Sequence, residues 1–312
     1  MDKLLSKPIY VHTYPAQKKI ASILCTYDNL IENNTQRIRL LEEMAAEIYK
    51  EWFLLFRFPN YENTKFFDKE AKEVTHGTKG ALPEGWSILK LRECLSHYIG
   101  GGWGEEEAQG KNNIPAYVIR GTDFPDFNAG KLNFEVLRYH TKSNLSSRVC
   151  KPDDLIFEVS GGTESQSLGR TCFLSKNALE RFDQPVICAS FCKLIRVDNS
   201  KISPYYINEM LNRMYNTGEL MIYQVQSTGI SNYQFEDFIE ATKVIIPTKE
   251  IQQKFERIVK PMYEEIQTLG EKNEILQETR DLLLPRLISG KLSVEDLKIE
   301  QMNMAVEPQL NY

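Results

Sequence analysis

The sequence has few of the residues that metal and disulfide sites require. Only 4 histidines accompany 6 cysteines in 312 residues, and Cys188 and Cys192 are the only closely spaced cysteines. A structural zinc site needs four ligands in recognisable clusters, so we expect no metal and reduced, partly buried thiols. The sequence also lacks an apolar run of about 18 residues, and residues 1–15 lack the segments of a signal peptide. We therefore expect a cytoplasmic protein without a membrane span.

Catalytic motifs are missing as well. The sequence contains neither a GxxxxGK[ST] phosphate loop nor an HExxH motif. The stretch from Asp153 to Ser160 is similar to a nuclease metal site, but Ser160 stands where lysine is expected. We interpret Asp153 and Asp154 as part of a turn before a strand, and Gly100 to Gly104 as a solvated loop. A self-contained enzyme is therefore disfavoured, and no cofactor is expected.

Positive charge is not in excess. The net charge is −5, and residues 83–247 hold 17 Lys and Arg against 20 Asp and Glu. A free-standing DNA-binding protein is usually basic, so this balance argues against one. Any contact with DNA would need positive charge concentrated on one face, or phosphate contacts supplied by a partner.

An internal repeat organises the chain. A shift of 235 residues places Gln17 on Gln252 and Ile31 on Ile266, together with four further identities. Each copy carries apolar residues at alternating steps of four and three, as in the seam of a coiled coil. The first seam comprises Ile20, Leu24, Tyr27, Ile31, Asn34, Ile38, Leu41, Ala45, Ile48 and Trp52, and the second comprises Phe255, Val259, Met262, Ile266, Leu269, Asn273, Leu276, Arg280, Leu283 and Leu287.

These seams predict two long helices packed as an antiparallel coiled coil, and two unrelated amphipathic surface helices are the alternative. Each seam contains one asparagine, and an asparagine at such a position fixes the register of the paired helices or the choice of partner helix. Pro261 predicts a bend, and Pro285 with Gly290 predicts the end of the second helix. At the end of the first helix, Trp52, Phe53 and Phe56 either pack internally or form part of a docking site.

The segment between the helices has a different composition. A linker rich in charge and turn-forming residues precedes strand-like stretches punctuated by glycine. The expected strands are 116–119, 155–159, 171–174, 192–197 and 242–246, and the clearest helix is 204–216. Without regular strand–helix alternation, this pattern predicts one mixed domain in an α+β protein.

Three short motifs stand at the starts of the two expected helices and of the segment between them: Pro15-Ala16-Gln17-Lys18-Lys19-Ile20, Pro247-Thr248-Lys249-Glu250-Ile251-Gln252, and Leu82-Pro83-Glu84-Gly85-Trp86. With these motifs, the sequence resembles the specificity subunits of type I restriction–modification systems over nearly the whole chain. In that family a Pro-x-x-x-Gln helix start follows each target-recognition domain, and each domain opens with Leu-Pro-x-Gly-Trp. The stretch from Arg280 to Leu292 resembles the family's closing signature, and 227–232 resembles a turn before the domain's last strand.

The resemblance implies a non-catalytic subunit that reads double-stranded DNA, positions methyltransferase subunits and through them recruits the restriction subunit. Family members carry two recognition domains, whereas this chain has helix, domain, helix, and 11–15 is interpreted as the last strand of a missing domain. The chain is then a truncated product, a recombination cassette or a half-subunit that forms a homodimer. The expected segments are a domain remnant (1–14), a helix (15–57), a linker (58–81), a recognition domain (82–247), a helix (248–290) and a flexible tail (291–312).

Loop residues are the expected readers of DNA, because a scaffold fixes its loops in place. Arginine is expected on guanine or phosphate and glutamine on adenine, although each side chain is alternatively an ordinary solvated one. The candidates are Arg120, Thr122, Ser160, Gly161, Thr163, Ser165, Gln166, Arg170, Ser227, Thr228, Ser231 and Asn232. A second hypothesis is an interaction module that binds methyltransferase subunits without reading DNA; the acidic balance and the missing domain favour it.

Overall fold

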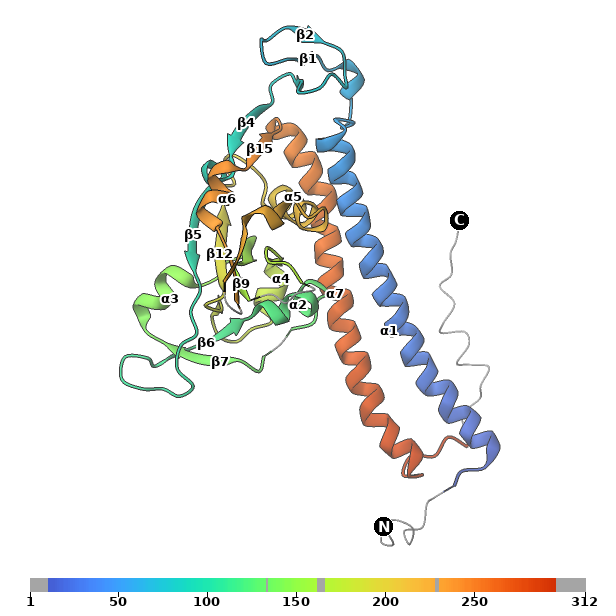
Figure 1. The fold of residues 1–312 in the computed structure, drawn as a ribbon. Coiled ribbons are helices and arrows are strands. Elements are labelled where there is room, and N and C mark those ends of the chain that lie inside the picture. The colour runs from blue at the N-terminus through green and yellow to red at the C-terminus, as the bar shows by residue number, and fades with distance from the viewer. Residues whose placement is uncertain (1–10, 133, 162–165, 228–229, 296–312) are drawn as a thin grey trace. The chain divides into compact units, whose positions relative to one another are not determined.

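A computed structural model describes residues 11–132, 134–161, 166–227 and 230–295, which fall into two compact units. Unit 1 consists of Met1–Arg39 and Thr268–Tyr312, and unit 2 of Leu40–Gln267. The two long helices α1 (Tyr14–Tyr49) and α7 (Lys249–Ile288) each contribute residues to both units (Figure 1). Within the described residues, no helix has both the length and the apolar character that crossing a bilayer requires.

The other elements all lie in unit 2. The shorter helices are α2 (Phe124–Asn128), α3 (Lys142–Arg148), α4 (Lys176–Glu180), α5 (Pro204–Asn216) and α6 (Phe235–Ala241), with a π-helical turn at Lys50–Leu54 and 3-10 turns at Tyr61–Asn63, Leu91–Cys94, Gly121–Asp123 and Glu219–Tyr223. The strands are β1 (Phe66–Phe67), β2 (Glu73–Val74), β3 (Leu82–Pro83), β4 (Ser87–Lys90), β5 (Leu95–Gly100), β6 (Ile114–Ile119), β7 (Leu137–His140), β8 (Asp154–Glu158), β9 (Ser160–Gly161), β10 (Thr171–Leu174), β11 (Val186–Cys188), β12 (Cys192–Val197), β13 (Gln224–Ser227), β14 (Ile230–Tyr233) and β15 (Lys243–Ile246).

The α+β class expected from the sequence is confirmed. β10, β12 and α5 have the predicted bounds, and the predicted strands 116–119, 155–159 and 242–246 correspond to β6, β8 and β15. The strand expected at 11–15 is wrong, because 11–13 are not strand and α1 already begins at Tyr14. Residues 58–81, expected as a linker, include β1 and β2, which join β3 in a small antiparallel sheet.

A four-stranded antiparallel sheet in the order β10-β8-β12-β5 separates two hydrophobic cores. Successive side chains of a strand point to opposite faces, and in β8 both of these faces are buried. Leu155 and Phe157 pack into the core that contains α5 and α6, whereas Ile156 packs into the core that contains α2 and α4. All three are fully buried, which is why the strand reads as a continuous apolar run.

Every residue of the two predicted seams is buried or half-buried. In unit 1, α1 and α7 contact each other in antiparallel order: Ile20 packs with Leu287, and Asp28 pairs with Arg280 at 2.7 Å. The Asn34 amide donates a 2.9 Å hydrogen bond to the Asn273 side-chain oxygen. The one asparagine of each seam is therefore the other's partner.

In unit 2, the aromatic residues that follow α1 pack internally, which decides between the two alternatives given by the sequence. Trp52 and Phe53 are buried, and the Phe53 ring lies 5.0 Å from that of Phe255 between ring centroids. The half-buried Phe56 ring lies 5.6 Å from the Trp86 ring, so the Leu-Pro-x-Gly-Trp phrase supplies core packing.

The starts of α1 and α7 have the same kind of side-chain hydrogen bond to the backbone. The Gln17 amide donates to the backbone carbonyl of His12 at 2.9 Å, and the Gln252 amide donates to that of Pro247 at 2.8 Å. Each bond reaches five residues back along the chain. The residue equivalent to Pro247 is therefore His12 and not Pro15, so the Pro-x-x-x-Gln spacing expected from the resemblance is wrong in both copies.

The prolines and glycine of the second helix have different effects. α7 runs through Pro261 without interruption and ends at Ile288, one turn after Pro285. Gly290 follows with a φ of 72°, a left-handed conformation that favours glycine and ends helices. The predicted helix end is confirmed, whereas the bend at Pro261 stays a prediction.

Candidate functional site

Six of the predicted DNA-contacting residues line one cavity of about 710 Å³ in unit 2. They come from three separate segments: the turn after β6, strand β9, and the loop before β10. The six are Arg120, Thr122, Ser160, Gly161, Gln166 and Arg170. The fold therefore brings together residues that are up to 50 positions apart in the sequence.

Arg170 is held by a buried carboxylate at the floor of this cavity. Its guanidinium forms two hydrogen bonds to Glu158, at 2.9 and 2.7 Å, and a third to the Gly121 carbonyl at 2.9 Å. The side chains are 18% and 6% exposed, so the pair is shielded from water. The bonds to Glu158 raise the pKa of Arg170. Arg170 is thus foremost a structural residue, and its role as a reader of guanine or phosphate stays a prediction.

Gln166 and Gly121 complete the surroundings of this ion pair. The Gln166 amide lies 2.7–3.0 Å from all three guanidinium nitrogens and accepts from them when its oxygen faces Arg170. A side chain at Gly121 would meet the Glu158 carboxylate at 2.5 Å, so only glycine allows the turn to approach so closely. The floor of the cavity is therefore a connected polar network of fixed geometry.

Arg120 is paired in the same way nearer the surface. Its guanidinium donates to both carboxylate oxygens of Asp123, at 3.0 and 2.7 Å, and its backbone N–H donates to Asp123 as well. The Arg120 side chain is 35% exposed. Each arginine of the cavity thus has its own carboxylate, and the cavity has no net positive charge from these four side chains.

Two further candidates lie beside Ser160 in a small sheet. β9 pairs with β14, which places Ser231 opposite Gly161 and Asn232 opposite Ser160. The Ser160 hydroxyl donates to the Asn232 side-chain oxygen at 3.0 Å, and the exposed Asn232 adds a polar group at this edge. Ser227 is the last residue of β13, and the candidates Thr163, Ser165 and Thr228 lie outside the described residues.

Glu158, Trp103 and Phe191 are among the cavity residues that were not predicted from the sequence. Trp103 follows the glycine cluster that we interpreted as a solvated loop, and it is 42% exposed. Phe191 is 60% exposed although it directly precedes the buried strand β12. An aromatic residue beside a glycine cluster was the available signal for Trp103, whereas no sequence pattern marks Phe191.

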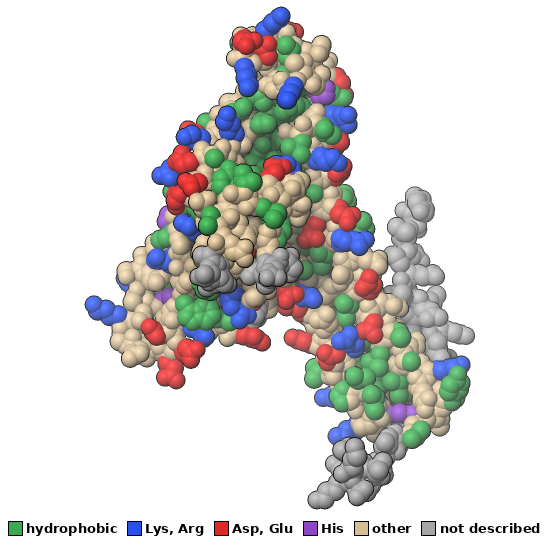
Figure 2. Space-filling view, in the orientation of Figure 1, with side chains coloured by type: hydrophobic (Ala, Val, Ile, Leu, Met, Phe, Trp, Pro, Cys, Tyr) green, Lys and Arg blue, Asp and Glu red, His purple; other side chains and the backbone are tan. Residues whose placement is uncertain are grey.

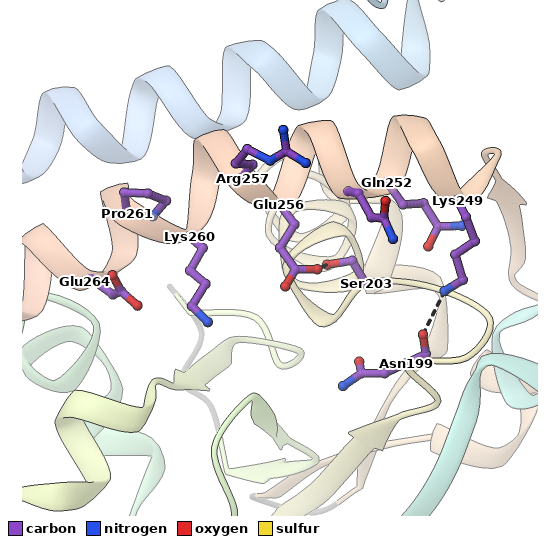
Figure 3. A pocket seen from close by; sticks show the side chains of 10 residues that line it. Asn199, Ser203, Lys249, Gln252, Glu256, Arg257, Lys260, Pro261 and Glu264 are labelled. Atoms are coloured by element: carbon purple, nitrogen blue, oxygen red, sulfur yellow. Dashed lines mark hydrogen bonds between the residues drawn. The ribbon is translucent and has the colours of Figure 1, made fainter.

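A second cavity, of about 600 Å³, lies along the first half of α7 (Figure 3). Its side chains are engaged with their own surroundings: Lys249 donates to the Asn199 carbonyl at 2.7 Å, and Ser203 donates to Glu256 at 3.0 Å. Lys260 and Glu264 add charges of opposite sign to the same lining. The cavity therefore offers no concentrated charge.

Charges of both signs are interspersed over the face of the molecule in view in Figure 2, and no continuous basic band crosses it. The absence of a basic excess in the sequence thus extends to this face. Among the described residues, no group of three or more His, Cys, Asp or Glu is arranged to hold a metal ion. All six cysteines are free, and five of them are buried.

One buried acid in unit 2 lies outside these cavities. Glu209 on α5 is 4% exposed, and the Tyr263 hydroxyl of α7 donates a hydrogen bond to its carboxylate. Burial raises the pKa of Glu209 to about 7, partly offset by the bond from Tyr263 and reinforced by Glu42. This carboxyl group therefore changes its charge near neutral pH.

The fold is similar to that of a solved specificity (S) subunit of a type I restriction–modification system. The crystal structure of the type I restriction–modification system S subunit from M. genitalium matches with a TM-score of 0.53 and 15% identity, covering 88% of this chain and 61% of that one. At this identity the similarity concerns the fold alone. No protein-family model matches the sequence.

Curated relatives have the same description. The specificity subunit of the type I restriction enzyme MjaIX of Methanocaldococcus jannaschii is 28% identical over 299 residues, which cover 91% of this chain and 61% of that protein. That of HindI of Haemophilus influenzae is 23% identical, covering 93% of this chain and 70% of its own length. The resemblance found in the sequence is confirmed: the curated homologues of this chain are type I restriction enzyme specificity subunits. The chain spans about three fifths of the length of the MjaIX relative.

Proposed function

We propose that this chain is a sequence-specific DNA-recognition subunit of a type I restriction–modification complex in the cytoplasm. It is not itself an enzyme; it reads double-stranded DNA and positions methyltransferase subunits and, through them, the restriction subunit. The observation that carries the proposal is the single cavity that unites Arg120, Ser160, Gln166 and Arg170 in a chain whose relatives are specificity subunits.

The recognition surface comprises this cavity and the adjoining residues Ser231 and Asn232 of β14. Side chains that contact base edges specify sequence, and phosphate contacts only set position. Gln166 and Asn232 are the amide side chains at this surface: the exposed Asn232 addresses adenine through two hydrogen bonds, and Gln166, whose oxygen faces Arg170, donates to a base through its NH2 group. Because each arginine is already paired with a carboxylate, specificity here relies on neutral hydrogen-bonding groups, and the methyltransferase supplies much of the phosphate contact.

The long helices serve as the assembly part of the subunit. We propose that α1 and α7 form an antiparallel coiled coil fixed in register by Asn34 and Asn273, with the recognition domain spanning 82–247. The 2.9 Å bond between these asparagines supports this register, because any shift by one turn would leave both amides without each other. We further propose that two copies of the chain form a homodimer, in which each recognition domain reads one half-site.

The alternative function is an interaction module that binds methyltransferase subunits without reading DNA. The paired state of both cavity arginines favours it, since neither presents an uncompensated positive charge to a phosphate. The two functions differ in one respect: only the recognition subunit makes a complex with the methyltransferase retain particular DNA sequences.

Light scattering would give the mass of the full chain, alone and with its methyltransferase partner. The complex would then be mixed with random-sequence DNA, and the DNA that it retains would be sequenced. We expect a dimeric complex that enriches a two-part motif with matching halves. A complex that forms but enriches no sequence would exclude the recognition role and leave the interaction module.

Matched variants connect the result to the cavity. Asn232→Ala should relax the retained motif at one position, because a bidentate contact contributes about 1–3 kcal/mol of discrimination. Gln166→Ala should relax the motif less, because its oxygen is engaged by Arg170. Asn113→Ala, an exposed amide that does not line the cavity, should retain the wild-type motif.

A further inference from the structure

Two aromatic side chains at the cavity mouth have no evident structural reason to be exposed. Phe191 and Trp103 both line the cavity, and they are 60% and 42% exposed. The guanidinium of Arg138 covers Trp103, with 4.9 Å between its central carbon and the ring centroid. Exposed aromatic surface on a cavity rim is typical of a ligand site.

The loop that carries Phe191 is held firmly in this position. The Phe191 carbonyl accepts hydrogen bonds from the backbone N–H groups of Val159 and Ser160, at 2.9 and 3.1 Å. The Cys192 N–H donates to Ala189 at 2.9 Å, which closes the turn. The Phe191 ring is therefore presented from a fixed backbone and not from a loose loop.

The glycine cluster brings Trp103 to the same place. A side chain on Gly101 would meet the Ala189 carbonyl oxygen at 2.2 Å, so only glycine lets the two loops touch. Backbone bonds from Gly101 to the Cys192 carbonyl and from Gly102 to the Cys188 carbonyl, both 2.9 Å, join them. The segment from Gly100 to Gly104, which the sequence predicts to be a solvated loop, therefore supports one wall of the cavity.

Below this aromatic rim lie polar groups that can read the edge of a planar ligand. The Glu158 carboxylate, the Arg170 guanidinium and the Gln166 amide supply acceptors and donors in a fixed arrangement. Proteins that hold a base outside the duplex stack combine these two features: aromatic contacts to the ring face and hydrogen bonds to its edge. A volume of about 710 Å³ is ample for one nucleobase with its sugar.

We propose that this cavity binds a single nucleobase displaced from the DNA stack, with its face on Phe191 and Trp103 and its edge toward Gln166 and the Glu158–Arg170 pair. The inference rests on the proposed function, since it concerns how the same site reads DNA. It makes Phe191 a specificity-determining residue that recognises an unstacked base, in addition to any contacts with paired bases.

Two DNA probes of one sequence test this proposal. In one, 2-aminopurine is paired with thymine in a duplex; in the other, it is an unpaired single-nucleotide bulge. Fluorescence anisotropy gives the affinity of the full chain for each, alone and with the methyltransferase partner. We expect tighter binding of the bulged duplex, because its base is already out of the pairing that must otherwise be broken.

Three variants separate the stack from other contacts. Phe191→Ala should weaken binding of the bulged duplex by about 5- to 150-fold, the value of one base–aromatic stack, with a smaller effect on the paired duplex. Phe191→Tyr should restore the preference. Phe134→Ala, which removes a 42% exposed aromatic ring of unit 2 that does not line the cavity, should leave both affinities unchanged.

Each other outcome is informative. Equal affinity for the two duplexes, or an equal loss for both with Phe191→Ala, would overturn the base-binding cavity and leave the proposed function intact. Failure of the chain and its complex to retain either duplex or any sequence from random DNA would refute both the recognition role and this inference.

Discussion

Replacing Arg170 with alanine should destabilise unit 2 strongly. The substitution leaves the Glu158 carboxylate, 6% exposed, without the cation that now forms two hydrogen bonds with it. Removing one partner of a buried ion pair costs about 3–5 kcal/mol, because the remaining charge stays buried and uncompensated. A typical domain has a free energy of unfolding of about 5–15 kcal/mol, so a large part of the stability should be lost.

Urea unfolding monitored by tryptophan fluorescence measures this effect. Trp86 and Trp103 both lie in unit 2, so the signal follows the part of the protein that contains the ion pair. The double variant Arg170→Met with Glu158→Leu should recover most of the lost free energy, since it removes both charges and keeps the volume apolar. Arg170→Lys should lie between wild type and Arg170→Ala, because lysine keeps the charge but loses the two-pronged geometry.

A shift of the urea midpoint by Arg170→Ala that is no larger than that of a surface variant such as Lys176→Ala would contradict the structural role of Arg170. An unchanged midpoint combined with a loss of DNA binding of about 1–3 kcal/mol would instead make Arg170 a reader of bases. The DNA affinity of Arg170→Ala should therefore be compared with that of the wild type only without urea and at a temperature at which the variant is folded.

Three further predictions concern other parts of the chain. Asn273→Leu alone should lower the free energy of unfolding by about 1–3 kcal/mol in thermal melts, because the half-buried Asn34 amide loses its partner, whereas leucine at both positions should restore it. Burial raises the pKa of Glu209 from its ordinary value of 4.5 to about 7, so the folded state binds more protons between these pH values and stability should fall as pH rises from about 4.5 to 7. Glu209→Gln, which retains an acceptor for Tyr263, should flatten this slope in a pH series of urea titrations and gain up to about 3 kcal/mol at pH 8. Gly101→Ala should weaken DNA binding without unfolding the protein, because the added carbon displaces the Trp103 loop; a wild-type affinity would show that this loop takes no part.

The regular elements were predictable where one physical signal dominated. The seam of α1 and α7 follows from apolar periodicity, whereas the hydrogen bond between Asn34 and Asn273 is seen only in the structure, since the sequence shows no more than one asparagine in each seam. β10 and β12 are mostly apolar stretches next to turn residues, with Thr171 in the first and Lys193 and Arg196 in the second, so their bounds could be predicted. The small sheet of β1, β2 and β3 could not, because its strands are two residues long and carry no periodicity.

The site was only half predictable. Polar residues at expected loops identified Arg120, Gln166 and Arg170, but not that carboxylates already hold the two arginines. Glu158 belongs to a buried strand and pairs with a residue 12 positions away, which no local pattern reveals. Likewise, the role of Gly101 depends on a contact with Ala189, and such distant contacts are set by tertiary packing alone.

The shared hydrogen bond at the start of α1 and α7 has a consequence for how such a chain can evolve. Gln17 and Gln252 each bond to a backbone carbonyl, supplied by histidine in one case and proline in the other. Because the backbone is the same for every residue, the junction makes no demand on the side chain that precedes the helix. Any segment that places a backbone carbonyl five residues before the glutamine can be joined there, so different preceding segments can share one kind of helix start.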